Sequence, residues 1–434
     1  MKSASLARTL SLFDATMLVI GCIVGVGIFR TASAIAGQVP SPAWILALWA
    51  AGGVVSLCGA LCYAELSSMF PASGGDYVYI REVYGRFWAF LFGWTKLFIE
   101  RTGTIAILGF VFAEYFRKIL PYDDLTLRLT AAGAIVALTA VNVIGLRWGT
   151  LVQNSFTVVK IAALLGLIAA GAWAWLARNT VQPAWTLSAP VDAPSLALAF
   201  VFVLWTYGGW TEAAYVAEEV REPTRNVPQA IVQGVLLTTV LYMLVNWSYL
   251  LFVPVESLPK TPLVAAWVAQ DVLGARGAVV MAGFITCSAF GALNGYILTG
   301  GRILFAMGRD FPALAKLGMV DARFHTPARA LWVNAAIAAV LVFTKTLDQI
   351  MTYSTVVISL FFMMAVVAVF VLRRREPQRA RPYRTWGYPV TPLIFCLTIA
   401  GFIANVWIKE PKEALFGFAF LAVGLPLYWL SARR

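Results

Sequence analysis

The sequence predicts an all-α integral membrane protein with twelve transmembrane helices, two of which break near the middle of the membrane. Three observations support this. The chain has 434 residues, of which 60% are hydrophobic and only 12% are charged, about half the share of a soluble domain. Apolar segments long enough to cross a bilayer recur along its whole length. Glycines interrupt two of these segments, at residues 25–27 and 208–209.

Each predicted transmembrane segment follows from an apolar run of about 20 residues, the length that crosses a bilayer. The loops between the segments leave no room for a soluble domain, and the longest loops cover 178–193 and 254–274. The predicted segments are 11–36, 44–69, 85–118, 125–144, 151–177, 194–219, 229–253, 275–308, 329–344, 347–372, 388–408 and 414–431.

The basic residues orient these segments. With the N-terminus in the cytoplasm, 20 of the 33 Lys and Arg residues fall on the cytoplasmic side, nine fall outside and four lie within segments. This asymmetry predicts a multi-pass protein of the plasma membrane with both termini in the cytoplasm. The net charge of +12 therefore indicates topology rather than a nucleic-acid partner. We expect the arginine-rich run at 373–384 to lie against anionic lipid headgroups of the bilayer.

Reactive residues are scarce. All five cysteines fall within predicted segments, which argues against structural disulfides and against a disulfide-linked partner outside the membrane. His325 is the single histidine, so we expect no metal site. The sequence contains no phosphate-binding glycine loop and no serine nucleophile motif. We therefore expect no cofactor and no enzymatic activity.

The two glycine clusters occupy corresponding places in the chain. A helix that breaks inside a membrane exposes backbone groups that find no water, so such breaks occur where they line a cavity. Each cluster lies in the first segment of a block of five. Because five is odd, the second block has inverted topology, which is the arrangement of transporters with a site at the midplane. We expect inverted repeats at 1–180 and 181–375, followed by two further segments in 376–434.

The breaks predict a site for a small zwitterion. In the first segment, carbonyl groups end a half-helix near Ile23 and N–H groups begin the next near Gly27; the sixth segment, which runs in the opposite direction, repeats this at residues 205–209. Helix N-termini favour a carboxylate and C-termini an ammonium group, and an α-amino acid carries both. Trp205 is our choice for a gate over the ligand. Alternatively, the glycines serve close helix packing and the nearby aromatic residues pack in the core.

Several segments of the sequence resemble motifs of the amino acid–polyamine–organocation superfamily of permeases, and its LAT-like branch in particular. The similarity runs in order along nearly the whole chain, and Arg101 and Lys160 add to it. The segments are Ile23-Val24-Gly25-Val26-Gly27-Ile28-Phe29, Tyr63-Ala64-Glu65-Leu66 with Pro71-x-x-Gly74-Gly75-Asp76-Tyr77, Tyr207-Gly208-Gly209-Trp210, Glu218-Glu219-Val220-x-x-Pro223-x-Arg225-Asn226-Val227-Pro228, Phe290-Gly291-Ala292-Leu293-Asn294-Gly295 and Thr326-Pro327-x-Arg329-Ala330.

The resemblance implies the leucine-transporter fold with a 5+5 inverted repeat, alternating access, and recognition of substrate by the backbone at both breaks. Val26 stands where that branch usually has serine, so a hydroxyl contact to the substrate is absent. Animal members pair with a glycoprotein through an external cysteine after the third segment. Residues 121–124 contain no cysteine, so we expect no disulfide-linked heavy chain. The implied substrate-binding residues are Ile23, Gly25, Val26, Gly27, Trp205 and Gly208.

Charged residues inside the segments are costly, about 2.5–3.5 kcal/mol each on insertion scales, so they need polar partners. The resemblance places Lys160 where sodium-coupled relatives bind Na⁺, and its ammonium group is expected to tie first-segment carbonyls to Ser288. This implies sodium independence, with Lys160 either a structural strut or a group that couples protons. Glu212 either senses protons, contacts a cationic substrate or simply begins a helix. We expect Lys96 and Glu100 to pair.

Together, the residues and the resemblance predict a secondary transporter of L-amino acids that works by sodium-independent exchange or proton-linked uptake. Lys160, Ser288, Glu212 and Tyr207 are the residues we expect to couple or gate transport. A polyamine or cationic amino acid antiporter is the first alternative, and Glu212 would favour it. A non-transporting amino acid sensor is the second alternative.

Overall fold

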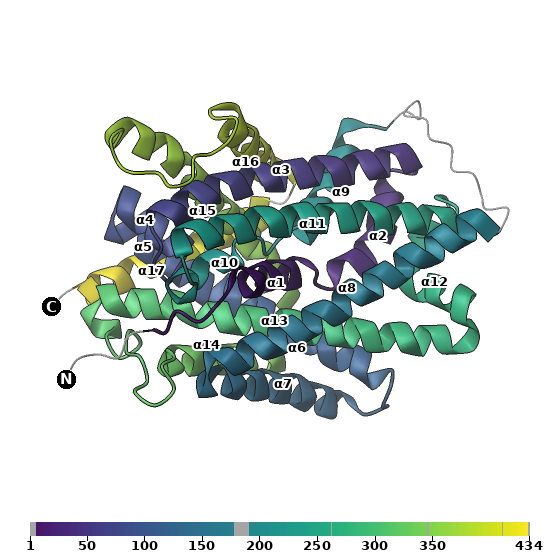
Figure 1. The fold of residues 1–434 in the computed structure, drawn as a ribbon, viewed down its shortest axis with the longest axis horizontal. Coiled ribbons are helices and arrows are strands. Elements are labelled where there is room, and N and C mark those ends of the chain that lie inside the picture. The colour runs from purple at the N-terminus through teal and green to yellow at the C-terminus, as the bar shows by residue number, and fades with distance from the viewer. Residues whose placement is uncertain (1–5, 178–190, 262, 345–346, 410, 433–434) are drawn as a thin grey trace.

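The computed structural model describes residues 6–177, 191–261, 263–344, 347–409 and 411–432, and these residues form a single bundle of helices (Figure 1). The one β-type contact among them is an isolated parallel bridge between Leu10 and Val220. The α-helices are α1 Leu12–Ile23, α2 Gly27–Gln38, α3 Pro42–Met69, α4 Asp76–Tyr84, α5 Arg86–Thr95, α6 Thr102–Arg117, α7 Asp124–Ile144, α8 Leu146–Ala177, α9 Ala193–Thr206, α10 Glu212–Tyr215, α11 Pro223–Phe252, α12 Val264–Leu273, α13 Gly277–Asp310, α14 Ala328–Phe343, α15 Leu347–Arg375, α16 Val390–Lys409 and α17 Pro411–Ala432.

The membrane-protein prediction is confirmed at the level of helix length and composition. Among the described residues, eight helical stretches are long and apolar enough to cross a membrane, or nine if the bent pair of α1 and α2 counts as one span. They correspond to nine of the twelve predicted segments. The total of twelve stays a prediction, because helices also occupy the other three segments but are short or interrupted.

These three segments differ from ideal spans for identifiable reasons. The segment predicted at 85–118 is divided into α5, the π-helix η1 (Lys96–Arg101) and α6. The segments predicted at 194–219 and 329–344 contain the apolar helices α9 and α14, which are 14 and 16 residues long. Their apolar sequences fit the interior of a bilayer, but their lengths fall short of the usual span.

Two predicted loops have different outcomes. Most of the loop predicted at 178–193 lies outside the described residues, which resume at 191. The loop predicted at 254–274 is largely helical, because it contains the 3₁₀ turn η3 (Leu258–Lys260) and all of α12. A short helix, α4, also lies between the second and third predicted segments.

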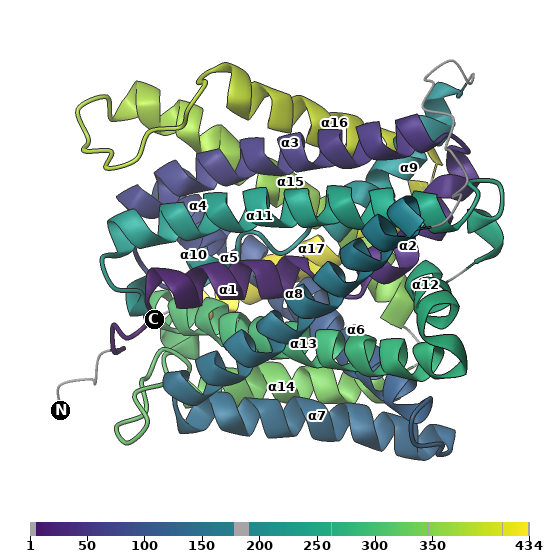
Figure 2. The same cartoon turned by 45° about the vertical axis from the view of Figure 1, so that its right-hand side comes forward.

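The broken first segment lies at the centre of the bundle. Helix α1 packs against α8, α11 and α13, and both views show it surrounded by these longer helices (Figures 1 and 2). Helix α2 packs against α9 and α12, so the two halves of this segment contact different parts of the fold. The start of α1 and the end of α17 lie at the same end of the bundle (Figure 1).

Backbone and charged contacts hold that end of the bundle together. The Leu10 N–H donates to the carbonyl oxygen of Glu219 at 3.0 Å, and the Arg221 N–H donates to the Leu10 carbonyl at 2.8 Å. The fully buried Glu219 also pairs with Arg302 of α13, with 2.9 Å between Nε and Oε2. The segment after α10 is thereby joined to both the chain start and α13.

Candidate functional site

The first helix break lies where the glycine pattern predicts it. Helix α1 ends at Ile23 and α2 begins at Gly27, with a bend of 40° between them, and residues 24–26 are not helical. A Cβ atom added to Gly25 would meet nothing closer than the Ile23 carbonyl oxygen at 3.9 Å. The backbone at Gly25 therefore faces open space, whereas Gly27 packs 3.0 Å from Thr206 of α9 by the same measure.

The start of α2 carries a group of unpaired backbone donors. No side chain caps this helix, and the hydrogen bonds of the described residues give no acceptor to the N–H groups of Val26, Gly27 or Ile28. Three unpaired N–H groups at a helix N-terminus, with the partial positive charge of the helix dipole, form a site that favours an anion such as a carboxylate.

The carbonyl groups at the end of α1 are held by donors from other helices. The Tyr242 hydroxyl of α11 donates to the Ile23 oxygen at 2.9 Å, and Lys160 Nζ of α8 donates to the Gly21 oxygen at 2.6 Å. The Ser288 hydroxyl of α13 reaches the Gly25 oxygen at 3.1 Å. Since a carbonyl oxygen accepts two hydrogen bonds, the Ile23 oxygen is already satisfied by Tyr242 and by the Gly25 N–H at 2.7 Å. The Gly21 and Gly25 oxygens keep acceptor capacity for an ammonium group.

Lys160 and Ser288 therefore contact first-segment carbonyls, as expected, but they reach different ones. The described residues contain no direct hydrogen bond between the two side chains, so the predicted tie runs through the backbone of residues 21–25. Lys160 is 1% exposed. Gly291 of α13 lies against its side chain, since an added Cβ atom would be 3.1 Å from Lys160 Cε.

The second break lies slightly later than predicted. Trp205 and Thr206 are still helical, residues 207–211 form turns, and α10 is a single turn that starts at Glu212. Gly209 has a φ of +106°, and a Cβ atom added there would lie 2.8 Å from the carbonyl carbon of Cys22. Only glycine fits this conformation and this contact, so the two breaks pack directly against each other.

The second break also offers unpaired donors. The Gly208 N–H is already used, because it donates to the Trp205 oxygen at 3.0 Å. The hydrogen bonds of the described residues give no acceptor to the N–H groups of Gly209, Trp210 or Thr211. A ligand contact from Gly208 would therefore use its carbonyl group, while Gly209, Trp210 and Thr211 would supply N–H groups.

The three aromatic residues near the second break have different surroundings. Trp205 is 57% exposed and is free to take part in a gate. Tyr207 is fully buried, and its hydroxyl donates to the Trp49 oxygen of α3 at 3.1 Å. Trp210 is also buried and packs edge-on against Tyr63, with ring centroids 4.9 Å apart. Core packing, the alternative considered from sequence, therefore describes Tyr207 and Trp210 in this structure.

Glu212 is buried in an ion pair that the sequence did not identify. Its Oε2 lies 2.9 Å from Arg101 Nη1 and also accepts a short hydrogen bond from Thr299 of α13. Both charged side chains are almost completely buried. Sequence reasoning singled out Arg101 and Glu212 separately but had no signal for their proximity. The expected pair of Lys96 and Glu100 is confirmed, at 3.2 Å.

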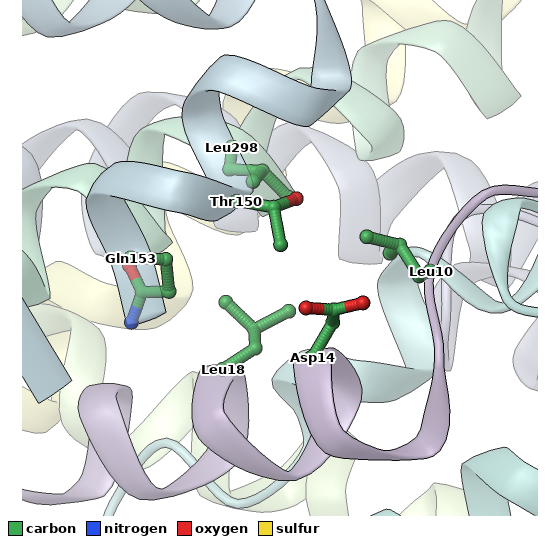
Figure 3. A pocket seen from close by; sticks show the side chains of 6 residues that line it. All are labelled: Leu10, Asp14, Leu18, Thr150, Gln153 and Leu298. Carbon is green, nitrogen blue, oxygen red and sulfur yellow. The ribbon is translucent and has the colours of Figure 1, made fainter. Parts of the chain in front are cut away.

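A small pocket lies apart from the breaks, beside the first turns of α1 (Figure 3). Asp14 and Leu18 from α1 face Thr150 and Gln153 from α8 across it. A hydrogen bond connects the pocket to α13, since Gln153 Oε1 accepts from Asn294 Nδ2 at 3.0 Å. Within the described residues, no group of three or more His, Cys, Asp or Glu side chains is placed to hold a metal ion.

Comparison with known proteins gives a consistent result. A sequence profile of the family described as amino acid permease matches residues 10–427. The chain is 32% identical to the mouse b(0,+)-type amino acid transporter 1, with 99% of this chain and 89% of the relative covered. It is 28% identical to the serine/threonine exchanger SteT of Bacillus subtilis (99% and 98% covered) and 30% identical to the mouse large neutral amino acids transporter small subunit 2 (98% and 81% covered). A broken first segment at the centre of a helical bundle and these matches lead to one conclusion: the chain belongs to the amino acid permease family of membrane transporters.

Proposed function

We propose that this protein is a secondary transporter that exchanges neutral L-amino acids across the membrane without sodium. The observation that carries the proposal is the pair of helix breaks in mutual contact, each with unpaired backbone N–H groups and with carbonyl groups nearby. The relatives support it, because their names describe amino acid transporters and one exchanger.

The substrate α-carboxylate would bind at the start of α2, on the N–H groups of Val26 and Gly27. The α-ammonium group would bind carbonyl oxygens at the first break, with the Ile23 oxygen giving up its contact with the Gly25 N–H for the ligand, and the carbonyl group of Gly208. Gly25 would allow the ligand to approach the backbone, because the space beside it is open. Trp205 would close over the ligand from the second break. Recognition through the backbone requires no particular side chain, which suits substrates that share only their zwitterionic end.

The state of Glu212 favours neutral substrates over cationic ones. A polyamine or an arginine-like substrate would need a carboxylate free to bind its second cation. Arg101 and Thr299 both bind Oε2 of Glu212, and separating a buried ion pair leaves an uncompensated charge that costs about 3–5 kcal/mol. We therefore favour exchange of neutral amino acids over antiport of polyamines.

Lys160 would make the protein independent of sodium. Its ammonium group is buried against the carbonyl groups of the first break, where a bound metal cation would need oxygen ligands of the same kind. Lys160, Ser288 and Glu212 each connect a break to another helix, so they are placed to couple occupancy to movement. Tyr207 would act as a structural contact of α9 with α3 in gating.

We also propose the topology that goes with this function. Alternating access would involve the inverted repeats 1–180 and 181–375 in a leucine-transporter fold of twelve helices, with 376–434 adding two. The protein would lie in the plasma membrane with both termini in the cytoplasm. We propose no disulfide-linked heavy chain, because the chain segment between α6 and α7 has no cysteine.

Counterflow in liposomes that contain only the purified protein tests the proposal. We expect labelled leucine, alanine or serine to accumulate when the vesicles are preloaded with an unlabelled neutral amino acid, and not when they are empty. Replacing Na⁺ by choline should leave the rate unchanged. Stronger competition by arginine or putrescine than by any neutral amino acid would favour the cationic antiporter instead.

The same vesicles decide between transport and sensing. A sensor would bind amino acids, as measured by a shift in thermal unfolding, but would give no counterflow. Gly27→Leu supplies the matched variant, because the larger side chain would block the backbone and clash with Thr206. Binding that survives this change would contradict the proposed site.

A further inference from the structure

Asp76 begins helix α4 and lies in a tight contact with α10. The preceding Gly74 and Gly75 have φ values of +120° and +52°, and a Cβ atom on Gly75 would lie 2.8 Å from the Tyr215 ring. The Gly74 N–H donates to the Tyr215 carbonyl oxygen at 3.1 Å. The two glycines thus bring the first turn of α4 against the one-turn helix that follows the second break.

The Asp76 carboxyl group is fully buried and only half satisfied. Its Oδ2 accepts a hydrogen bond from the Tyr215 hydroxyl at 2.7 Å, and its exposure is 0%. Its Oδ1 makes no hydrogen bond of good geometry among the described residues, and its one polar neighbour there is the buried hydroxyl of Tyr63, which faces the carboxyl group from α3 and interacts with it. A buried carboxylate oxygen without a well-placed donor is costly. The contact between Oδ1 and Tyr63 can be made in two ways: the Tyr63 hydroxyl donates to a carboxylate, or a carboxylic acid donates its own O–H to the Tyr63 oxygen.

The charges around Asp76 do not balance when every group is ionised. Two cations face three carboxylates in this buried cluster, and each cation has another partner: Lys96 pairs with Glu100 and Arg101 with Glu212. The partial charge at the start of α4 favours the carboxylate, but only by a fraction of a charge. The titratable and charged groups that face Asp76 are Tyr63 of α3, Tyr79 of α4, Lys96 and its partner Glu100 of η1, and Glu212 and Tyr215 of α10 with Arg101 behind them.

We propose that Asp76 is a proton-binding site, protonated while α4 and α10 are in contact and deprotonated when α10 moves away and water enters. In the closed form the proton would lie on Oδ1 and donate to the Tyr63 oxygen. On opening, that O–H bond would break and the proton would pass to water, leaving a hydrated carboxylate. The site would make the cycle sensitive to pH on the side where α4 and α10 separate. This inference rests on the proposed transport function.

Burial supports the same assignment, because desolvation, together with the charge of Glu212, raises the pKa of the Asp76 carboxyl group above its usual range, although Lys96 and the hydroxyls of Tyr215 and Tyr63 act in the opposite direction. A carboxyl group with a raised pKa binds its proton more tightly in the folded, closed form than in the unfolded chain. Its contribution to stability is therefore present at low pH and is lost as the pH rises from the ordinary pKa of aspartate towards the raised value.

The variant Asp76→Asn tests the proposal, because asparagine has the shape of the protonated acid and can still accept from Tyr215. We expect the exchange rate of the wild type to fall with rising pH, by at most about tenfold per pH unit for one site, and that of Asp76→Asn to be flat over the same range. Asp310→Asn is the control, since Asp310 pairs with Arg81 at 3.0 Å; it should keep the pH profile of the wild type. An Asp76→Asn profile that matches the wild type would overturn the proposal.

A second variant keeps the test decisive if Asp76→Asn fails to fold. Tyr63→Phe removes only the hydroxyl that faces the Asp76 carboxyl group. If that hydroxyl accepts the Asp76 proton, its loss should shift the pH profile of exchange and of thermal unfolding to lower pH. A shift to higher pH, or none, would mean that Asp76 is ionised in the closed form and would refute the site. Absence of counterflow in every variant and in the wild type would instead refute the proposed function.

Discussion

The two helix breaks are similar in position but are anchored by different means. At the first break, donors from α8, α11 and α13 bind backbone carbonyl oxygens of residues 21–25. At the second break, Tyr242 also reaches one backbone oxygen, that of Thr206 at 3.3 Å, but the charged contacts to Arg101 and Thr299 depend on one side chain, Glu212. Anchors on backbone atoms survive changes of the anchored side chains, whereas an ion pair depends on both of its members. The second break should therefore be much more sensitive to single substitutions.

The largest expected effect comes from breaking the ion pair at the second break. Arg101→Met leaves Glu212 buried without a cation, which costs about 3–5 kcal/mol of stability. Thermal unfolding in detergent should fall steeply and transport should be lost. The double variant Arg101→Met/Glu212→Gln should recover much of the stability, because the charge that Arg101 compensated is removed as well. Arg309→Met removes an ion pair that is partly exposed and should cost under about 1 kcal/mol. Equal stability of the single and double variants would contradict this comparison.

A matched pair of glycine substitutions separates packing from ligand access. Gly209→Ala adds a Cβ atom to a left-handed residue, 2.8 Å from the backbone of Cys22. We expect a loss of about 1–3 kcal/mol, measured by thermal unfolding, together with loss of transport. Gly25→Ala adds the same atom into open space, so it should leave stability unchanged while weakening substrate binding in a ligand-dependent thermal shift. If both variants are equally unstable, the space beside Gly25 is not a ligand site.

At the first break, Lys160→Met removes one of three anchors. The loss of a charged donor to the Gly21 oxygen should cost about 1.5–3 kcal/mol, less than Arg101→Met because no charge is left unpaired. Exchange in liposomes should fall by more than tenfold while most protein remains folded on a sizing column. Thr157→Val, which removes a donor to the Met17 oxygen from the same face of α8, is the control. An unchanged exchange rate in Lys160→Met would show that the ammonium group has no role in transport.

The smallest expected effect is that of Ser288→Ala. Its hydroxyl makes hydrogen bonds of 3.1 and 3.4 Å to the Gly25 and Val24 oxygens, whose loss is worth about 1 kcal/mol. The KM for exchange should rise about fivefold, which is the equivalent of that energy, with little change in stability. Thr286→Ala is matched, because the Thr286 hydroxyl bonds only within its own helix, to Ala282. A larger effect in Thr286→Ala would contradict a special role for Ser288.

Local features of the molecule could be predicted from sequence because their physical cause is local. Glycines in a membrane-length apolar run predicted the break at residues 24–26, and the spacing of Lys96 and Glu100 predicted their pair. The backbone contacts of Lys160 also followed from the cost of a charge inside a membrane.

Features that depend on how distant segments meet could not be predicted in the same way. Nothing local to Arg101 or Glu212 indicates that the third and sixth segments bring them to 2.9 Å. Tyr207 and Trp210 are aromatic, as gate residues often are. Only their contacts with α3 in the folded protein show that both are buried. Helix α10 ends after one turn although its sequence continues to be compatible with a helix, because the chain turns there towards Leu10.

That turn has a consequence for how the protein opens. Two backbone hydrogen bonds join Leu10, just before α1, to Glu219 and Arg221, which follow α10. Either α1 and α10 move together as one rigid unit, and the protein opens with both hydrogen bonds intact, or each transport cycle must break and re-form these two hydrogen bonds. In the second case, amide hydrogen exchange at Leu10 and Arg221 would follow the fraction of open molecules; in the first case, both amides would stay protected in the open and the closed protein.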